Sequence, residues 1–154
     1  EGRGRCLALA PRGLALAAIH QRMIAMEVPF RAALLAWLAA DPALSGALNA
    51  IVEEAPARTA MPWLAIAASA GADWSVKDRD GRELRLALEL HCRGDRPESA
   101  ATLVSAIEQR LAAMPRDHAG FTLVSCQFLR SRAEQRAANT RAVLIEYRFR
   151  LLAA

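Results

Sequence analysis

The chain is poor in cysteine and has no long apolar run, and both shortages limit what it can be. The three cysteines, Cys6, Cys92 and Cys126, are odd in number, widely separated and without a CxxC pair. This favours a reducing, cytosolic-type compartment and argues against a structural zinc site. No apolar stretch approaches the roughly 18 residues that a membrane-spanning helix needs, so we expect no contact with a membrane.

Lysine is almost absent, because Lys77 is the only one among the twenty basic residues and the others are arginine. Genomic base composition is our preferred explanation for this bias, and bidentate arginine contacts at an interface are the alternative. The formal net charge is +4. That charge is too small to indicate a nucleic-acid binder, and no basic run with interleaved aromatic residues accompanies it.

A length of 154 residues, with 54% hydrophobic and 23% charged residues, predicts one globular domain with its own core. Residues 1–25 differ from the rest, since they are dominated by arginine, alanine, leucine and glycine. Pro11 and its neighbours interrupt their apolar run, which argues against a secretion signal. We expect residues 1–25 to be an extension outside the fold and residues 26–154 to form the domain, although propensity alone allows a helix across Leu14 to Met26.

Two segments have the apolar spacing of helices. The first begins at Pro29, carries a stripe through Phe30, Leu34, Trp37 and Leu38, and ends before the Asp41-Pro42 pair. Residues 43–62 that follow show no regular pattern. The second helix begins at Pro97 and stops at Pro115, and its stripe consists of Ala100, Leu103, Val104, Ile107, Leu111 and Met114.

The strongest strand signal is the segment "DWSVKDRDGRELRLALELHCR", residues 73–93. Asp80-Gly81 is a turn signal between strands, and apolar and polar residues then alternate strictly. Further strands are predicted at residues 63–69, 120–132 and 140–153, with a polar loop at 133–139. The sequence therefore predicts an α+β fold with a mainly antiparallel sheet of four to five strands and two helices packed on one face.

No group of residues in this pattern predicts catalysis, a cofactor or a metal. Neighbouring strand residues point to opposite faces, so His91 and Cys92 cannot bind one ion, and each is interpreted as structural. The histidines form no HExxH motif and the serines no GxSxG motif. Asp78 and Asp80 are turn formers without the further ligands of a calcium loop. We predict no catalytic, cofactor-binding or metal-binding residues.

The polar faces of the predicted strands remain to be explained. Glu83, Arg85, Glu89, Arg148 and Arg150 carry both signs of charge. Such a face is usually only solvated, which is the simpler interpretation. The alternative is a contact with a neighbouring subunit, in which paired charges set the register.

Four segments resemble one family in their order: "FRAALLAWLAADPAL", "EEAP" followed by "MPWLAIA", "DWSVKDRDGRELRLALELHCR", and "FLRSR" followed by "TRAVLIEYRFRLL". They resemble the tail-completion proteins, also called tail terminators or head–tail joining proteins, of long-tailed bacteriophages and alphaproteobacterial gene transfer agents. The resemblance covers roughly residues 29–152, and residues 73–93 are its most specific part. The first 25 residues depart from the family pattern, so we expect Met23 or Met26 to be the natural start.

The resemblance implies a small α+β protein, assembled in the bacterial cytoplasm, that forms a ring of typically six copies at the head–tail junction of the particle. Such a ring caps the tail tube and joins it to the head. Its partners would be copies of itself, the tail-tube protein and a head-completion or stopper protein, with DNA passing through without sequence-specific binding. Family members have no catalytic residues. We expect a subunit or tail-tube contact at the hairpin turn, formed by Lys77, Asp78, Arg79, Asp80 and Arg82.

Three other functions stay open at the level of sequence. The first is a head-completion stopper or connector ring at the same junction. The second is a small α+β enzyme, which would require a pocket with convergent ionisable groups. The third is a nucleic-acid binder, which would lose affinity steeply with salt.

Overall fold

The computed structural model describes the backbone of residues 12–95 and 97–154, and the side chains from residue 26 onward except residue 96. Its elements in chain order are α1 Arg12–Ala39, α2 Pro42–Ala47, β1 Ala50–Val52, β2 Trp63–Asp73, β3 Gly81–Arg93, α3 Pro97–Ala112, β4 Asp117–His118, β5 Phe121–Arg136 and β6 Thr140–Ala153.

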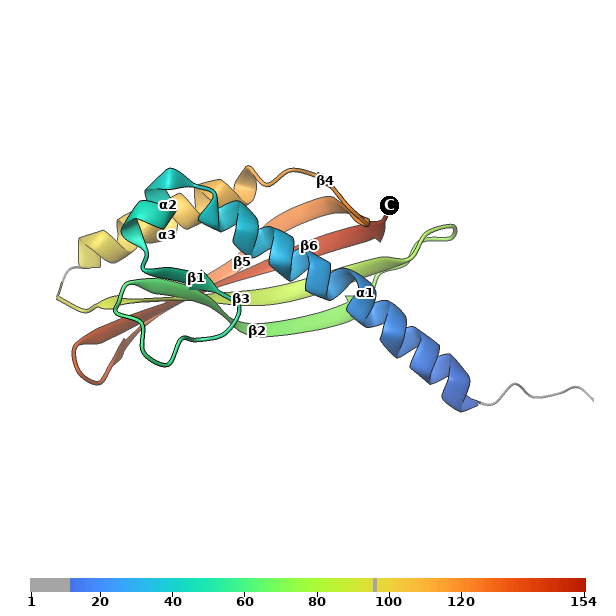
Figure 1. Cartoon of the computed structure of the whole chain (residues 1–154), viewed down its shortest axis with the longest axis horizontal. Helices are drawn as coiled ribbons and strands as arrows, with labels where there is room; N and C mark the ends of the chain where they lie inside the picture. The colour runs from blue at the N-terminus through green and yellow to red at the C-terminus, as the bar shows by residue number, and fades with distance from the viewer. Residues whose placement is uncertain (1–11, 96) are drawn as a thin grey trace, which may run out of the picture.

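The strands form one sheet in the order β1-β2-β3-β6-β5-β4 (Figure 1). All neighbouring pairs are antiparallel except β1 with β2, which is parallel. The predicted α+β class and the largely antiparallel pairing are confirmed. The predicted number of strands was too low and one helix was missed, because the described chain has six strands and three helices. The unpredicted elements β1, β4 and α2 are too short to show a period in the sequence.

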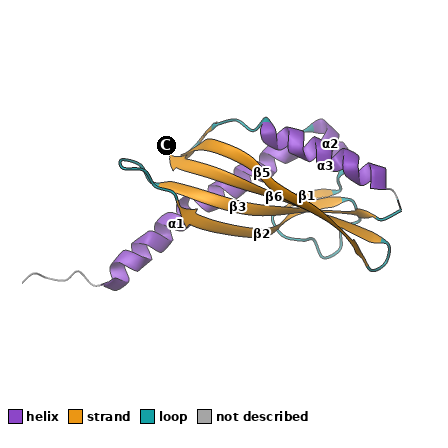
Figure 2. Ribbon diagram, turned by 180° about the vertical axis from the view of Figure 1, so that it is seen from behind, coloured by secondary structure: helices purple, strands orange, loops and turns teal. Residues whose placement is uncertain are grey.

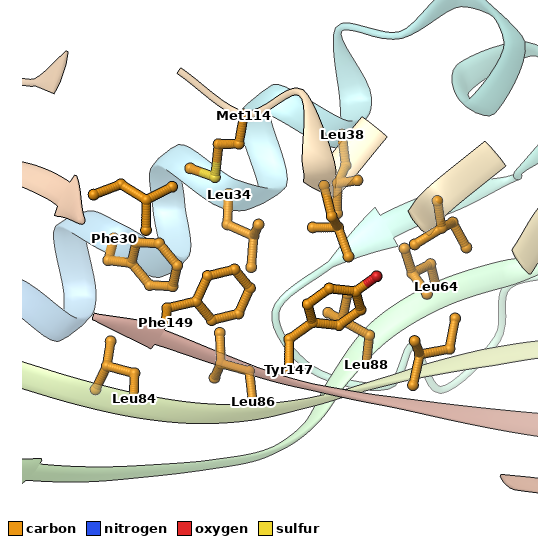
Figure 3. Close-up of a cluster of buried hydrophobic side chains, with 14 of the residues drawn as sticks. Phe30, Leu34, Leu38, Leu64, Leu84, Leu86, Leu88, Met114, Tyr147 and Phe149 are labelled. Atoms are coloured by element: carbon orange, nitrogen blue, oxygen red, sulfur yellow. The ribbon is translucent and has the colours of Figure 1, made fainter. Parts of the chain in front are cut away.

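The core lies between the helices and one face of the sheet, here called the inner face and defined by Leu84, Leu86, Leu88 and Leu90. Figure 3 shows Phe30, Leu34 and Leu38 of α1 pointing toward Leu84, Leu86 and Leu88 of β3, with Tyr147 and Phe149 of β6 between them. The opposite face, which carries the alternate residues of β3 and β6, is called the outer face. In Figure 2 the strands pass in front of α1, so this view looks toward the outer face.

Helix α1 begins much earlier than the sequence predicts. It starts at Arg12, and Pro29 lies inside it rather than in its first turn. Proline lacks a backbone N–H, so the carbonyl of residue 25 receives no helical hydrogen bond from Pro29. The first turns of α1 project past the sheet (Figures 1 and 2). Residues 1–11 of the predicted extension lie outside the described residues, and the expectation that residues 1–25 are dispensable for the fold stays a prediction.

The predicted helix end before Asp41-Pro42 is confirmed, but Asp41 also starts α2. Its Oδ1 accepts hydrogen bonds from the backbone N–H groups of Ala43 at 2.9 Å and Leu44 at 3.0 Å. Pro42 occupies the first helical position, where a missing N–H costs nothing. The helix buries Leu44 completely. This short helix corrects the prediction that residues 43–62 are irregular throughout.

Trp37 and Arg110 connect α1 with α3. The indole N–H of Trp37 donates to the Arg110 carbonyl at 2.8 Å, and Nε of Arg110 donates to the Trp37 carbonyl at 3.0 Å. The Arg110 guanidinium lies 3.3 Å from the centroid of the Trp37 ring. Trp37 is therefore half-buried, packs against the core cluster from the predicted stripe and also links the two helices.

Strand β5 is longer than predicted. It continues to Arg136, four residues beyond the predicted end, and the predicted loop shrinks to a tight turn with positive φ at Ala138 and Asn139. The burial pattern explains the error. Residues 127–136 are almost all exposed on both faces of the sheet, so the alternation fades along this stretch and the predicted strand ends at residue 132.

Glu27 of α1 and Gly71 of β2 approach each other closely at the inner face. A Cβ atom on residue 71 would overlap the Glu27 carboxylate and lie 3.1 Å from Leu84 Cδ2. Gly71 has no side chain, so α1 can lie against β2 at this point. One carboxylate oxygen of Glu27 is buried there without a hydrogen-bond partner.

Candidate assembly surfaces

The β2–β3 hairpin ends in a loop of residues 74–80, here called the hairpin tip. The backbone N–H of Trp74 donates to the Gly81 carbonyl at 3.1 Å, and that of Val76 donates to the Arg79 carbonyl at 2.9 Å. A Cβ on residue 81 would overlap the Trp74 carbonyl, so only glycine fits here. The predicted turn is thus confirmed. Glycine is required at position 81 because the Trp74 carbonyl lies close to it at the start of β3, and its φ is not positive.

The five residues predicted for a subunit or tail-tube contact divide into two groups. Lys77, Asp78, Arg79 and Asp80 are exposed in the hairpin tip. Arg82 is buried, with its side chain only 6% exposed, and it donates from Nη1 to Asp73 Oδ1 at 2.7 Å. Arg82 therefore supports the base of the tip, and the other four residues form its accessible surface.

Asp73 links the base of the tip to the loop above it. Ser75 Oγ donates to Asp73 Oδ1 at 2.7 Å and accepts from the Gly81 N–H at 3.1 Å. The Ser75 hydroxyl, followed by Arg82, lowers the pKa of the Asp73 carboxyl. The charged form of Asp73 thus holds both ends of the loop together.

The outer face carries ion pairs at one end of the sheet around Glu83. The Glu83 carboxylate accepts a hydrogen bond from Arg150 Nε at 2.9 Å, and Arg85 and Arg148 lie at 3.6 and 3.9 Å. Arg150 first, and then the other two arginines, lower the pKa of Glu83. Arg148 also donates to the side-chain oxygen of Gln127. One carboxylate thus faces three guanidinium groups, which leaves this part of the surface positive.

A second group of charges lies at the other end of the same face. Glu89 pairs with Arg136 at 2.5 Å and with His91 Nε2 at 3.1 Å. The His91 ring stacks on Trp63 with ring centroids 4.0 Å apart. Arg130 pairs with Glu146 at 2.9 Å between these two groups. These side chains form hydrogen bonds and ion pairs with one another, as expected for a strand face that carries both signs of charge.

His91 and Cys92 lie on opposite faces, as their sequence positions predict. Cys92 is buried on the inner side, where its thiol donates to the Arg141 carbonyl at 3.7 Å, and burial raises its pKa. An open hollow of about 380 Å³ beside it is lined by Pro62, Cys92, Arg93, Asp95, Ser99 and Leu103. A thiol with a raised pKa is a weak nucleophile at neutral pH, and His91 is on the wrong face to activate it.

The described part of the chain contains no group of three or more histidine, cysteine or acidic side chains placed to hold a metal ion. Within the same residues, no helix has both the length and the apolar character to cross a membrane. What the described surface does offer is exposed strand faces, a charged hairpin tip and free strand edges.

The sequence profile of the family described as tail completion protein gp17 matches residues 32–152. The chain belongs to this family. The match begins inside α1 and includes the sheet except for the last residue of β6, the hairpin tip and both other helices. The resemblance inferred from the sequence motifs is therefore confirmed.

Among the solved structures that match this tail-completion protein, one chain comes from a structure described as the virion of a native gene transfer agent particle. The two chains share 20% identity and superpose with a TM-score of 0.70, over 83% of this chain and 98% of the other. This likeness shows a shared fold. No curated protein sequence matches the chain.

Proposed function

We propose that this tail-completion protein is a structural virion component that acts as the tail terminator ring of a phage or gene transfer agent particle. The family match over residues 32–152 carries the proposal. The fold shared with a chain of a gene transfer agent virion supports it. The surface described above also supports it, because it presents strand faces and a projecting tip in place of a reactive cleft. We assign the chain no catalytic step.

In this role several copies, typically six, form a ring that caps the tail tube and contacts the head-completion or stopper protein on the other side. DNA passes through the ring without sequence-specific contacts. Assembly takes place in the bacterial cytoplasm, and the finished ring stays at the head–tail junction. Ring contacts are heterologous, so each copy uses two different surfaces, one for each neighbour.

The hairpin tip is the surface we assign to the contact with the tail tube or a neighbouring copy. Lys77, Asp78, Arg79 and Asp80 are exposed there and combine both signs of charge. Charged side chains at the rim of a contact fix orientation and speed association more than they add affinity. Arg82 contributes indirectly, since its bond to Asp73 holds the base of the tip.

Electron microscopy of particles that lack this protein tests the proposal. We expect filled heads and tails that remain separate, and we expect expression of the chain to restore joining. Normally joined particles in its absence would end the proposal. Binding of the purified chain to isolated tail tubes identifies a terminator, whereas binding to isolated heads alone identifies the alternative stopper ring.

A further inference from the structure

Both sides of the sheet leave part of a strand without a neighbour among the described residues. On one side β1 pairs only with residues 63–65 of β2, which leaves residues 66–73 uncovered. On the other side β4 pairs with residues 121–122 of β5, and the Arg116 carbonyl accepts from the Leu123 N–H at 2.7 Å. The rest of β5, residues 124–136, is uncovered. Free backbone N–H and C=O groups on such edges pair readily with another strand.

The two short covering strands lie at opposite ends of the sheet. Pairing across β3 and β6 places each β2 residue level with a β5 residue, for example Ala70 with Gln127 and Asp73 with Leu123. By this alignment the β2 residues that β1 covers, 63–65, are level with Arg132–Glu134 of β5. The β5 residues that β4 covers, 121–122, lie just beyond the level of Asp73, where β2 ends. The free part of β2 is therefore level with a free part of β5. In a direct pairing at this level, β1 occupies the position beside β2 that Arg132–Glu134 of a neighbouring β5 would take. The contact is therefore confined to residues 66–73 of β2 and 124–131 of β5.

The strand directions also fit. The pairs β2·β3, β3·β6 and β6·β5 are all antiparallel, so direction alternates across the sheet and β5 runs opposite to β2. A second copy in the same orientation, with its β2 edge beside the β5 edge of the first, continues the alternation as an antiparallel pair. Neither copy has to turn over. The geometry thus suits a head-to-tail contact between identical chains.

Side-chain character matches along the same stretch. Residues 66–72 of β2 and 123–129 of β5 are uncharged, and Phe128 and Leu129 are 45% and 37% exposed. The charged residues of β5 begin at Arg130, close to the level where β1 covers β2. Exposed strand edges normally carry charges or prolines that prevent pairing, and the level, uncharged parts of these two edges carry neither.

Bulges in the two strands mark the ends of the regular part of this contact. Register shifts at Val124 and Leu129 leave Ser125–Phe128 regular in β5, and a shift at Ala67 leaves β2 regular from Ala68 onward. Ser125–Phe128 is level with Ser69–Ala72. These β2 residues are small, so they leave room for the exposed Phe128 ring of the neighbouring copy.

We propose that the β5 edge of one copy pairs with the β2 edge of the next as an antiparallel extension of the sheet, centred on Ser125–Phe128 and Ser69–Ala72. A second copy of this chain is thus the occupant of both edges. The inference rests on the proposed function for its setting, because a ring needs a head-to-tail contact. It deepens that function by naming the two surfaces that meet.

Cysteine cross-linking tests the contact. Ala70 and Gln127 are exposed and level with each other, and facing residues in an antiparallel pair lie within the Cα distance that a disulfide requires. The double variant Ala70→Cys/Gln127→Cys should give a ladder of cross-linked species on a non-reducing gel. Ala68→Cys/Gln127→Cys and Ala72→Cys/Gln127→Cys cover a slip of two residues in register. All variants carry Cys6→Ser to remove one native thiol, and burial raises the pKa of Cys92 and that of Cys126, the latter to about 11.

The single variants Ala70→Cys and Gln127→Cys are the matched controls. In a head-to-tail contact neither can cross-link to itself, so both should stay monomeric on the gel. Dimers of a single variant would show that identical edges meet, which overturns the proposal. The absence of a ladder from all three double variants, in purified protein and in particles, also overturns it.

Charge variants provide an independent readout. Ala70→Lys places a charge on the exposed β2 edge opposite the positive surface near Arg148, and we expect it to abolish ring formation without unfolding the chain. Adding Gln127→Glu should restore ring formation. Joined particles with Ala70→Lys would refute the edge contact and leave the terminator function standing. If the double cysteine variants form a cross-linked ring but particles without the protein still join heads to tails, the edge contact would be supported and the terminator function refuted.

Discussion

Arg82 and Asp73 form a salt bridge across the β2–β3 pair in which the arginine is 6% exposed and the aspartate 72% exposed. Arg82 Nη1 has Asp73 as its charged partner, while Nε of the same guanidinium is buried without a hydrogen-bond partner. The pair is therefore asymmetric in burial, and the loss of Arg82 should affect stability differently from the loss of Asp73.

Replacing Asp73 should destabilise the protein more than replacing Arg82. Asp73→Ala leaves a buried guanidinium without its counter-charge, whereas Arg82→Met removes the buried charge and keeps an apolar side chain of similar length. We expect Arg82→Met to unfold at or above the urea concentration of the native chain, and Asp73→Ala to unfold at a lower one. An equal loss of unfolding free energy in both variants would mean that the charge pair itself stabilises the hairpin.

The pH dependence of stability should include a contribution from Glu83. The pKa of Glu83 is lowered by Arg150 and its neighbours, so this stabilisation is present above the ordinary value of 4.5 and is lost as the pH falls through the lower pKa of the folded state. Glu83→Gln should flatten the acid side of the curve of unfolding free energy against pH. Glu54→Gln, at an exposed loop position, is the control and should leave the curve unchanged.

Phe30 should be essential to the fold although it lies only four residues into the predicted domain. It is fully buried, and its ring centroid is 4.8 Å from that of Phe149 and 5.8 Å from that of Phe121. We expect Phe30→Ala to lower the free energy of unfolding by about 3–5 kcal/mol. Val28→Ala, two residues earlier and 46% exposed, should change it by less than about 0.5 kcal/mol. Urea denaturation of both variants measures the difference.

Removal of residues 1–25 should leave a folded domain. The core described here begins at Met26, and the family match begins at residue 32. We expect residues 26–154 to keep the far-ultraviolet circular dichroism of the sheet and a cooperative thermal transition. A fragment that fails to fold would show that the first half of α1 contributes to stability and would move the domain boundary toward Arg12.

Charge removal from the hairpin tip should impair assembly without changing stability. Lys77→Ala/Arg79→Ala alters two exposed side chains, so the melting temperature should stay the same while fewer heads and tails join. Arg58→Ala/Arg116→Ala removes the same charge from other exposed positions and is the matched control. Equal loss of joining in both variants would show a general charge effect in place of a contact at the tip.

The sequence predicts those elements in which one face is buried and the other is not. Strands β3 and β6 alternate cleanly, and the bounds predicted for β6 agree with the structure. The prediction fails where that contrast disappears. The second half of β5 is exposed on both faces, and the prediction ends the strand at residue 132 and assigns residues 133–136 to a loop. Pro29 indicates a helix start in the sequence, but it lies inside a longer helix.

The candidate surfaces were predicted only in part for a related reason. Strand parity placed His91 and Cys92 on opposite faces, and composition made Lys77 to Asp80 a charged tip. The sequence groups Arg82 with the residues of the hairpin turn, and its burial against Asp73 depends on tertiary packing. The free edges could not be predicted, because they depend on the insertion of β6 between β3 and β5. Only their signal, uncharged stretches at residues 66–72 and 123–129, was present in the sequence.

The close approach of Gly71 to Glu27 has an evolutionary consequence. A methyl group at position 71 displaces the end of the Glu27 side chain from its place above β2, so we expect the residues at the two positions to vary together. Relatives with alanine or serine at the first position should therefore carry a shorter residue at the second, and glutamate should recur where the glycine is retained.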